Sequence, residues 1–143
     1  MSQENVERVQ QIMEDFRAGK SEFDAEGMLT KIVGEDLMHP DIEWDASEAP
    51  FDLSGTFRGV EAVRHFWREW LAAWETLEFE YELVDGGDRV VVLLDQRMRG
   101  RTTGIDVPLG RYAQVYTFRD GLIVHWKVYA SQAKALEASG LRE

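Results

Sequence analysis

The second half of the chain constrains the fold most, because polar and apolar residues alternate there along four segments joined in pairs by glycine-containing turns. These segments are 77–84, 89–98, 111–118 and 122–130. The turns contain Asp-Gly-Gly-Asp at 85–88 and Arg-Asp-Gly at 119–121. Alternation on both sides of such turns predicts two antiparallel β-hairpins, each with one apolar face.

The loop length of the second hairpin decides which side chains share a face. A two-residue turn places Tyr116 and Phe118 with His125 and Lys127, whereas a three-residue loop with Gly121 in the left-handed conformation separates the two kinds of side chain. We therefore predict the three-residue loop. Its apolar face comprises Tyr112, Gln114, Tyr116, Phe118, Leu122, Val124, Trp126 and Val128.

The first hairpin has the same character. Its apolar face comprises Phe79, Tyr81, Leu83, Val90, Val92 and Leu94. On its other face, the expected register places Glu78 opposite Asp95, which is an unfavourable pair.

Helices are expected before the hairpins, over residues 3–18, 23–37 and 60–74, with a short strand over 41–45 between the second and third. A short helix over 131–139 closes the chain. Helices followed by antiparallel strands predict an α+β fold with the helices on one face of the sheet. We expect a single domain over 1–143, in which a curved, cone-shaped sheet wraps around the N-terminal helices and an internal apolar pocket.

The net charge of −11 argues against nucleic acid or an anionic membrane as a partner, because both require a basic surface. The chain has no cysteine, so thiolate chemistry is excluded. No run approaches the roughly 18 apolar residues of a membrane span, and the N-terminus lacks the features of a signal peptide. A cytoplasmic location is the resulting expectation.

Several segments in order resemble the nuclear transport factor 2-like superfamily, in its SnoaL-like or ketosteroid-isomerase-like branch. These segments are Arg-Ala-Gly at 17–19, His-Pro-Asp-Ile-Glu-Trp at 39–44, Phe-Arg-Gly-Val-Glu-Ala-Val at 57–63, the second hairpin over 115–124, and 135–141. The resemblance implies a cone-shaped pocket and a tendency to dimerise. It does not specify an activity, because the superfamily includes isomerases, dehydratases, polyketide cyclases, epoxide hydrolases and proteins that only bind.

The resemblance also implies a candidate base. Asp45 matches the position of the carboxylate that transfers a proton beside a substrate carbonyl in ketosteroid-isomerase-like members, and an apolar cavity would raise the pKa of such a carboxylate. The positions of that family's oxyanion donors correspond to Ile12 and Gln114. Since isoleucine cannot donate a hydrogen bond and glutamine donates only through a neutral amide, steroid-type isomerisation is not expected.

Other polar and aromatic side chains are candidates for substrate binding. Buried polar groups require partners, so they either pair with one another or hold a ligand. The candidates are Gln96, Tyr112, Gln114 and Tyr116, with Trp126, Phe16 and Trp70 as apolar walls. We predict no metal and no other cofactor, because no two histidines have ligand spacing and no carboxylate pair is expected beside one.

The outer face of the predicted sheet carries many apolar residues, and we expect it to form a homodimer interface. The residues are Val91, Leu93, Ala113, Val115, Ile123 and Tyr129. Three functions remain open: an enzyme that transfers protons on an apolar carbonyl-containing metabolite (an isomerase, dehydratase or cyclase), a non-catalytic binder of an apolar metabolite, and a protein-association domain whose pocket is filled by its own side chains.

Overall fold

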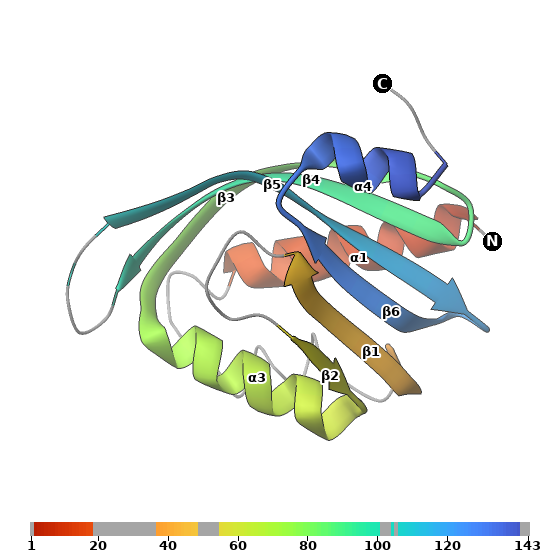
Figure 1. Cartoon of the computed structure of the whole chain (residues 1–143), viewed down its shortest axis with the longest axis horizontal. Coiled ribbons are helices and arrows are strands. Elements are labelled where there is room, and N and C mark those ends of the chain that lie inside the picture. The colour runs from red at the N-terminus through yellow and green to blue at the C-terminus, as the bar shows by residue number, and fades with distance from the viewer. Residues whose placement is uncertain (1, 19–36, 49–54, 101–103, 105, 141–143) are drawn as a thin grey trace.

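A computed structural model describes residues 2–18, 37–48, 55–100, 104 and 106–140. Within these residues it shows three helices and one six-stranded mixed sheet, which confirms the α+β class (Figure 1). The helices are α1 (Ser2–Ala18), α3 (Val60–Ala73) and α4 (Gln132–Ala138). The strands are β1 (Met38–Glu48), β2 (Thr56–Arg58), β3 (Trp74–Asp85), β4 (Arg89–Gly100), β5 (Asp106–Arg119) and β6 (Leu122–Tyr129).

The strand order is β2-β1-β6-β5-β4-β3, and every neighbouring pair is antiparallel except β1 and β6. The strand expected over 41–45 is longer than predicted, and His39 and Pro40 lie inside β1 rather than at a helix end. The predicted helix over 23–37 falls almost wholly on residues 19–36, which lie outside the described part. No helix within the described ranges is long and apolar enough to cross a membrane.

The two faces of the sheet are covered differently. The core face packs against α1 and α3, whose Val9, Ile12, Phe66 and Trp67 join its main apolar cluster. The outer face packs against α4 through a second, smaller cluster. Figure 1 shows the long strands bending as they pass over α1.

A bulge accompanies this bend. Gln96 of β4 pairs with Gly110 of β5, whereas the next residue, Arg97, pairs with Pro108, so that one extra residue lies in β5. Gly110 has φ of +79°, a conformation that glycine adopts without steric cost. Such bulges increase strand twist and curvature.

The first hairpin confirms the shared face of Tyr81 and Leu83 with Val92 and Leu94. The register on its other face differs from the prediction: Glu78 pairs with Arg97 and not with Asp95. The turn has the expected length but is displaced by one residue along the chain, since Asp85 pairs with Val90 and Gly86 N donates to Arg89 O. This shift preserves the apolar face and replaces an unfavourable charge pair by a favourable one.

The predicted loop of the second hairpin is wrong, although the predicted face of its main residues is right. Arg119 pairs with Leu122, so the turn has two residues, Asp120 and Gly121, with φ of +54° and +79°. Both angles are positive, as in a type I′ turn. A register shift then follows between Thr117 and Phe118, and it restores the pairing of apolar with apolar side chains.

The shift changes which residues of β6 face the core. Ile123, Trp126 and Val128 are buried, while Leu122 and Val124 are only partly buried. Ile123 therefore belongs to the core face and not to the outer face, because Val124 is the extra residue of the bulge. The bulge achieves the segregation that a longer loop was predicted to achieve.

Candidate functional site

A chain of hydrogen bonds crosses the core face from β6 through β5 to β4. Trp126 Nε1 and Tyr116 Oη both donate to Gln114 Oε1, over 3.1 and 2.7 Å. Gln114 Nε2 donates to Tyr112 Oη over 3.4 Å, and Tyr112 Oη donates to Gln96 Oε1 over 2.6 Å. We call these five residues the buried polar chain. Each is at most 9% exposed.

Alternation along β5 explains why three of its members meet. Tyr112, Gln114 and Tyr116 stand at every second position and therefore point to the same face. The register adds the other two: Trp126 lies directly opposite Tyr116, and Gln96 lies two positions along β4 from Leu94, the partner of Tyr112. Of the two alternatives, pairing with one another or holding a ligand, the structure shows the first for these polar groups.

Both tyrosine hydroxyls of the buried polar chain are held neutral. Burial raises the pKa of Tyr112 far above its usual range, although the hydrogen bond from Gln114 lowers it slightly. Burial also raises the pKa of Tyr116, and the neighbouring Tyr112 raises it further. The two hydroxyls therefore act as hydrogen-bonding groups and not as bases at neutral pH.

Aromatic rings line the core face beside this chain. Trp126 stacks against Tyr116 with ring centroids 4.8 Å apart, and against Trp67 of α3 at 5.4 Å. Trp44 of β1 packs edge-on against Trp67 at 5.9 Å. The Nε1 of Trp44 is buried, and it finds no hydrogen-bond acceptor among the described residues. Trp44 was not among the predicted wall residues, because its place beside Trp126 depends on the pairing of β1 with β6.

Two of the predicted wall residues cannot be placed. Phe16 and Trp70 belong to α1 and α3, but their side chains lie outside the described part of the structure. Tyr81 does not join the buried polar chain; its hydroxyl donates instead to Glu14 of α1.

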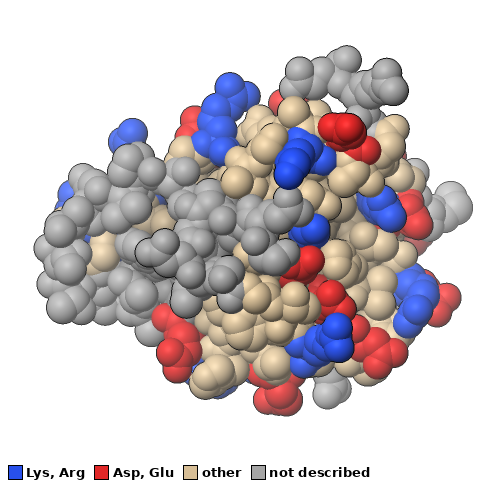
Figure 2. All heavy atoms as spheres, in the orientation of Figure 1, with Lys and Arg blue, Asp and Glu red and all other residues tan. Residues whose placement is uncertain are grey.

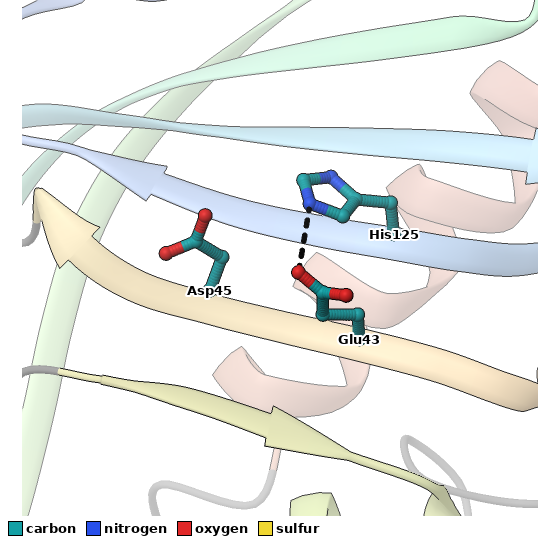
Figure 3. Close-up of side chains that lie close together, drawn as sticks. All are labelled: Glu43, Asp45 and His125. Carbon is teal, nitrogen blue, oxygen red and sulfur yellow. Dashed lines mark ion pairs between the residues drawn. The ribbon is translucent and has the colours of Figure 1, made fainter.

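Asp45 lies on the outer face, so its expected place at the edge of the apolar hollow is wrong. Its neighbours Trp44 and Ala46 are buried in the core, and alternation turns Asp45 to the other side of β1 (Figure 3). There its carboxylate lies 3.7 Å from Lys127 Nζ. The structure thus separates Asp45 from Gln114 by the thickness of the sheet. Proton transfer by Asp45 would take place on the outer face.

The parallel pairing of β1 with β6 also places a histidine beside two carboxylates. Glu43 pairs with His125, and Asp45 pairs with Lys127. His125 Nε2 lies 3.9 Å from Glu43 Oε1 (Figure 3). The sequence-based statement that no carboxylate pair stands beside a histidine is therefore wrong, since residues about 80 positions apart meet here.

The outer face is partly covered within the chain itself. Val91, Ala113 and Val115, three of the residues predicted to form a dimer interface, are buried against Ala135 and Leu136 of α4. Figure 2 shows acidic and basic side chains interspersed over the visible surface. Because α4 already covers this apolar stripe, exposed apolar area no longer argues for a dimer, and the homodimer stays a prediction.

Two depressions lie in the described surface, with volumes of about 370 and 330 Å³. The first is lined mainly by turn residues and the start of α1, and the second by β3, β4, Arg111 and Gln132. Neither is lined by a residue of the buried polar chain. The internal apolar pocket therefore stays a prediction.

Solved structures share the fold of this chain. An NTF2-like protein from Burkholderia thailandensis E264 is 28% identical, with a TM-score of 0.62, and the match covers 90% of this chain and 94% of that one. A proposed SnoaL-like polyketide cyclase from Jannaschia sp. CCS1 is 18% identical, with a TM-score of 0.70 and coverage of 89% and 85%. TerC, co-crystallised with polyporic acid, is 22% identical, with a TM-score of 0.61 and coverage of 93% and 98%. The fold is thus that of an NTF2-like cone.

The family follows from the sequence itself. The model of the SnoaL-like domain matches residues 9–126. The chain belongs to the SnoaL-like domain family, as its resemblance predicted. A search of the curated proteins finds no match to the chain.

Proposed function

We propose that the protein binds an apolar small molecule with a carbonyl group, held against the core face of the sheet, and that Gln96 donates a hydrogen bond to the carbonyl oxygen. The observation that carries this proposal is the direction of the buried polar chain. Every hydrogen bond in it runs toward Gln96, whose Oε1 accepts the last one. Gln96 Nε2 donates to no group within the described residues.

Hydrogen bonds connected in one direction polarise one another, so the last donor of such a chain is strengthened. A carbonyl oxygen is an acceptor only and matches a donor of this kind. The aromatic rings beside the chain supply the apolar contact area that an apolar ligand requires. The ligand class is therefore apolar and carbonyl-containing.

The composition of the core face favours binding over proton transfer. Among the described residues, the buried polar side chains are the amides Asn5, Gln96 and Gln114, together with the tyrosine hydroxyls. Amides do not titrate, and burial raises the pKa of both Tyr112 and Tyr116. A catalytic reaction of the isomerase, dehydratase or cyclase type would require a base that this set does not contain.

The structural neighbours are compatible with a ligand of this class. TerC has been crystallised with polyporic acid, and its fold is shared with this chain. The alternative is a protein-association domain whose core is filled by its own rings. Ligand binding separates the two alternatives directly.

The test is a titration of the protein with 1,4-naphthoquinone, with naphthalene as the carbonyl-free control. Binding is measured by the quenching of tryptophan fluorescence. The chain has no cysteine, so the quinone cannot add to a thiol. We expect the wild type to bind naphthoquinone more tightly than naphthalene. In Gln96→Leu this preference should fall by about 3–10-fold, the equivalent of one hydrogen bond. Gln10→Leu, which changes an exposed glutamine of α1, is the matched control and should keep the preference.

Two results would contradict the proposal. One is equal affinity for both compounds in the wild type. The other is a preference for naphthoquinone that survives in Gln96→Leu. Native mass spectrometry of protein purified from its own host adds a second readout, in which a co-purified apolar molecule supports binding and refutes a core closed by its own side chains.

A further inference from the structure

The outer face of β1 and β6 carries a group of side chains that the proposed function does not use. Parallel pairing places Glu43 beside His125 and Asp45 beside Lys127. We propose that Glu43, Asp45 and His125 form a binding site for a divalent first-row transition-metal ion. Figure 3 shows their side chains together, on the side of the sheet away from α1.

The distances suit one ion. One carboxylate oxygen from Glu43, one from Asp45 and one imidazole nitrogen from His125 all lie within 4.8 Å of one another. An ion such as Zn²⁺ binds nitrogen and oxygen at about 2.0–2.2 Å, which in tetrahedral geometry sets the ligand atoms about 3.3–3.6 Å apart. Small side-chain rotations close this difference. Within the described part of the chain, no second group of this kind is present.

The backbone under this site is well ordered by the sheet. All three residues lie in paired strands, and the adjacent residues Trp44 and Trp126 are buried at 1% and 0% exposure. Sites built on strands hold their ligands more accurately than sites built on loops. The positions of the three Cβ atoms are therefore set by the core packing.

The burial of the three side chains suits a bound ion with open positions. The side chains of Glu43, Asp45 and His125 are 33%, 15% and 35% exposed. Partial burial strengthens their attraction for a cation relative to that in bulk water. Three protein ligands leave at least one coordination position for water or a small molecule.

Two basic side chains occupy the region around these carboxylates. Lys127 Nζ lies 3.7 Å from Asp45, and Arg58 Nε lies 3.5 Å from Glu43. The carboxylates thus already attract cationic groups, and a metal ion would compete with these two side chains for the carboxylates. Arg58 is 80% exposed and screened by solvent. The Nζ of Lys127 also lies 4.8 Å from the centre of the Tyr129 ring, so Asp45 is not its only attraction.

The ligand set selects the class of ion. Imidazole nitrogen suits zinc, cobalt, nickel and copper, whereas magnesium and calcium prefer oxygen ligands alone. One imidazole with two carboxylates therefore favours a first-row transition metal.

The test is isothermal titration of tag-free, chelator-treated protein with Zn²⁺. We expect one Zn²⁺ per chain, and at least a tenfold loss of affinity in His125→Gln and, separately, in Glu43→Gln. Lys127→Met removes the competing cation and should strengthen binding several-fold. His65→Gln is the matched control, because His65 lies 3.7 Å from the single carboxylate of Glu69 on α3 and should not contribute to this site.

Each outcome bears on the proposal. Unchanged affinity in both His125→Gln and Glu43→Gln would overturn it, as would the absence of binding in the wild type and in Lys127→Met. A loss of affinity in His65→Gln as large as that in His125→Gln would show non-specific histidine binding and would also overturn it. A shift of the His125 ring signals in NMR spectra on addition of Zn²⁺, unaffected by 10-fold excess Mg²⁺, would support it. If His125→Gln does not fold, Glu43→Gln and the NMR shift decide.

Discussion

Replacement of Gln114 by leucine is predicted to destabilise the protein by removing the centre of the buried polar chain. Gln114 Oε1 accepts from two groups that are 0% exposed, Tyr116 Oη and Trp126 Nε1. Leucine has a similar size but accepts nothing, so both donors remain buried without a partner. Each such donor costs about 1–3 kcal/mol.

The net effect is smaller than the sum of these costs. Burial of leucine in place of an amide stabilises the folded variant by about 1–2 kcal/mol, because transfer of an amide from water to the protein interior is unfavourable. We therefore expect Gln114→Leu to lower the free energy of unfolding by about 2–4 kcal/mol. For a chain of this size, that corresponds to a fall in Tm of about 5–15 °C.

The assay is urea denaturation followed by tryptophan fluorescence and far-ultraviolet circular dichroism, with linear extrapolation to water. Tyr116→Phe removes one donor and leaves Gln114 with Trp126, so a loss of about 1 kcal/mol is expected. Tyr129→Phe is the matched control. Its hydroxyl makes no hydrogen bond within the described residues, and its stability should stay within about 0.5 kcal/mol of the wild type.

A double-mutant cycle isolates the interaction itself. In Gln114→Leu the hydroxyl of Tyr116 has already lost its acceptor, so adding Tyr116→Phe should cost little or should restore stability. A coupling energy of about 1 kcal/mol or more is expected. A Gln114→Leu variant within about 0.5 kcal/mol of the wild type, or two strictly additive losses, would refute the reasoning.

Three further predictions concern the second hairpin, α4 and the tyrosines. Gly121→Ala, at φ of +79°, should cost about 1 kcal/mol in urea denaturation, because a Cβ is disfavoured in this conformation; no loss would contradict the positive angle. Leu136→Ala should cost about 2–4 kcal/mol in the same assay by opening a cavity beneath α4, and a neutral result would show that α4 does not cover the sheet. Burial raises the pKa of Tyr112 and Tyr116 above that of an unfolded tyrosine, which is about 10. The stability that these two residues contribute is therefore complete below about pH 10 and is lost as the pH rises further. Phenolate absorbance of these two residues should therefore appear only on alkaline unfolding, and ionisation within the folded protein would count against their burial.

The sequence by itself determined the class of fold and most of the candidate site. Alternation with a period of two is a local property, so Tyr112, Gln114 and Tyr116 had to share a face of one strand. The spacing of apolar residues likewise predicted α1 and α3 within one or two residues. Trp126 lies on the same face even though the predicted loop was wrong. A bulge separates apolar from charged side chains as well as a longer loop would.

Only the tertiary structure decided where Asp45 points and what surrounds it. The parallel pairing of β1 with β6 joins residues about 80 positions apart, and no local pattern encodes which strands become neighbours. That pairing turned Asp45 toward Lys127 and brought Glu43 to His125. The docking of α4 likewise covered an apolar stripe that the sequence left open to a second subunit. Periodicity specifies which side chains share a face, but contacts between distant segments specify what that face meets.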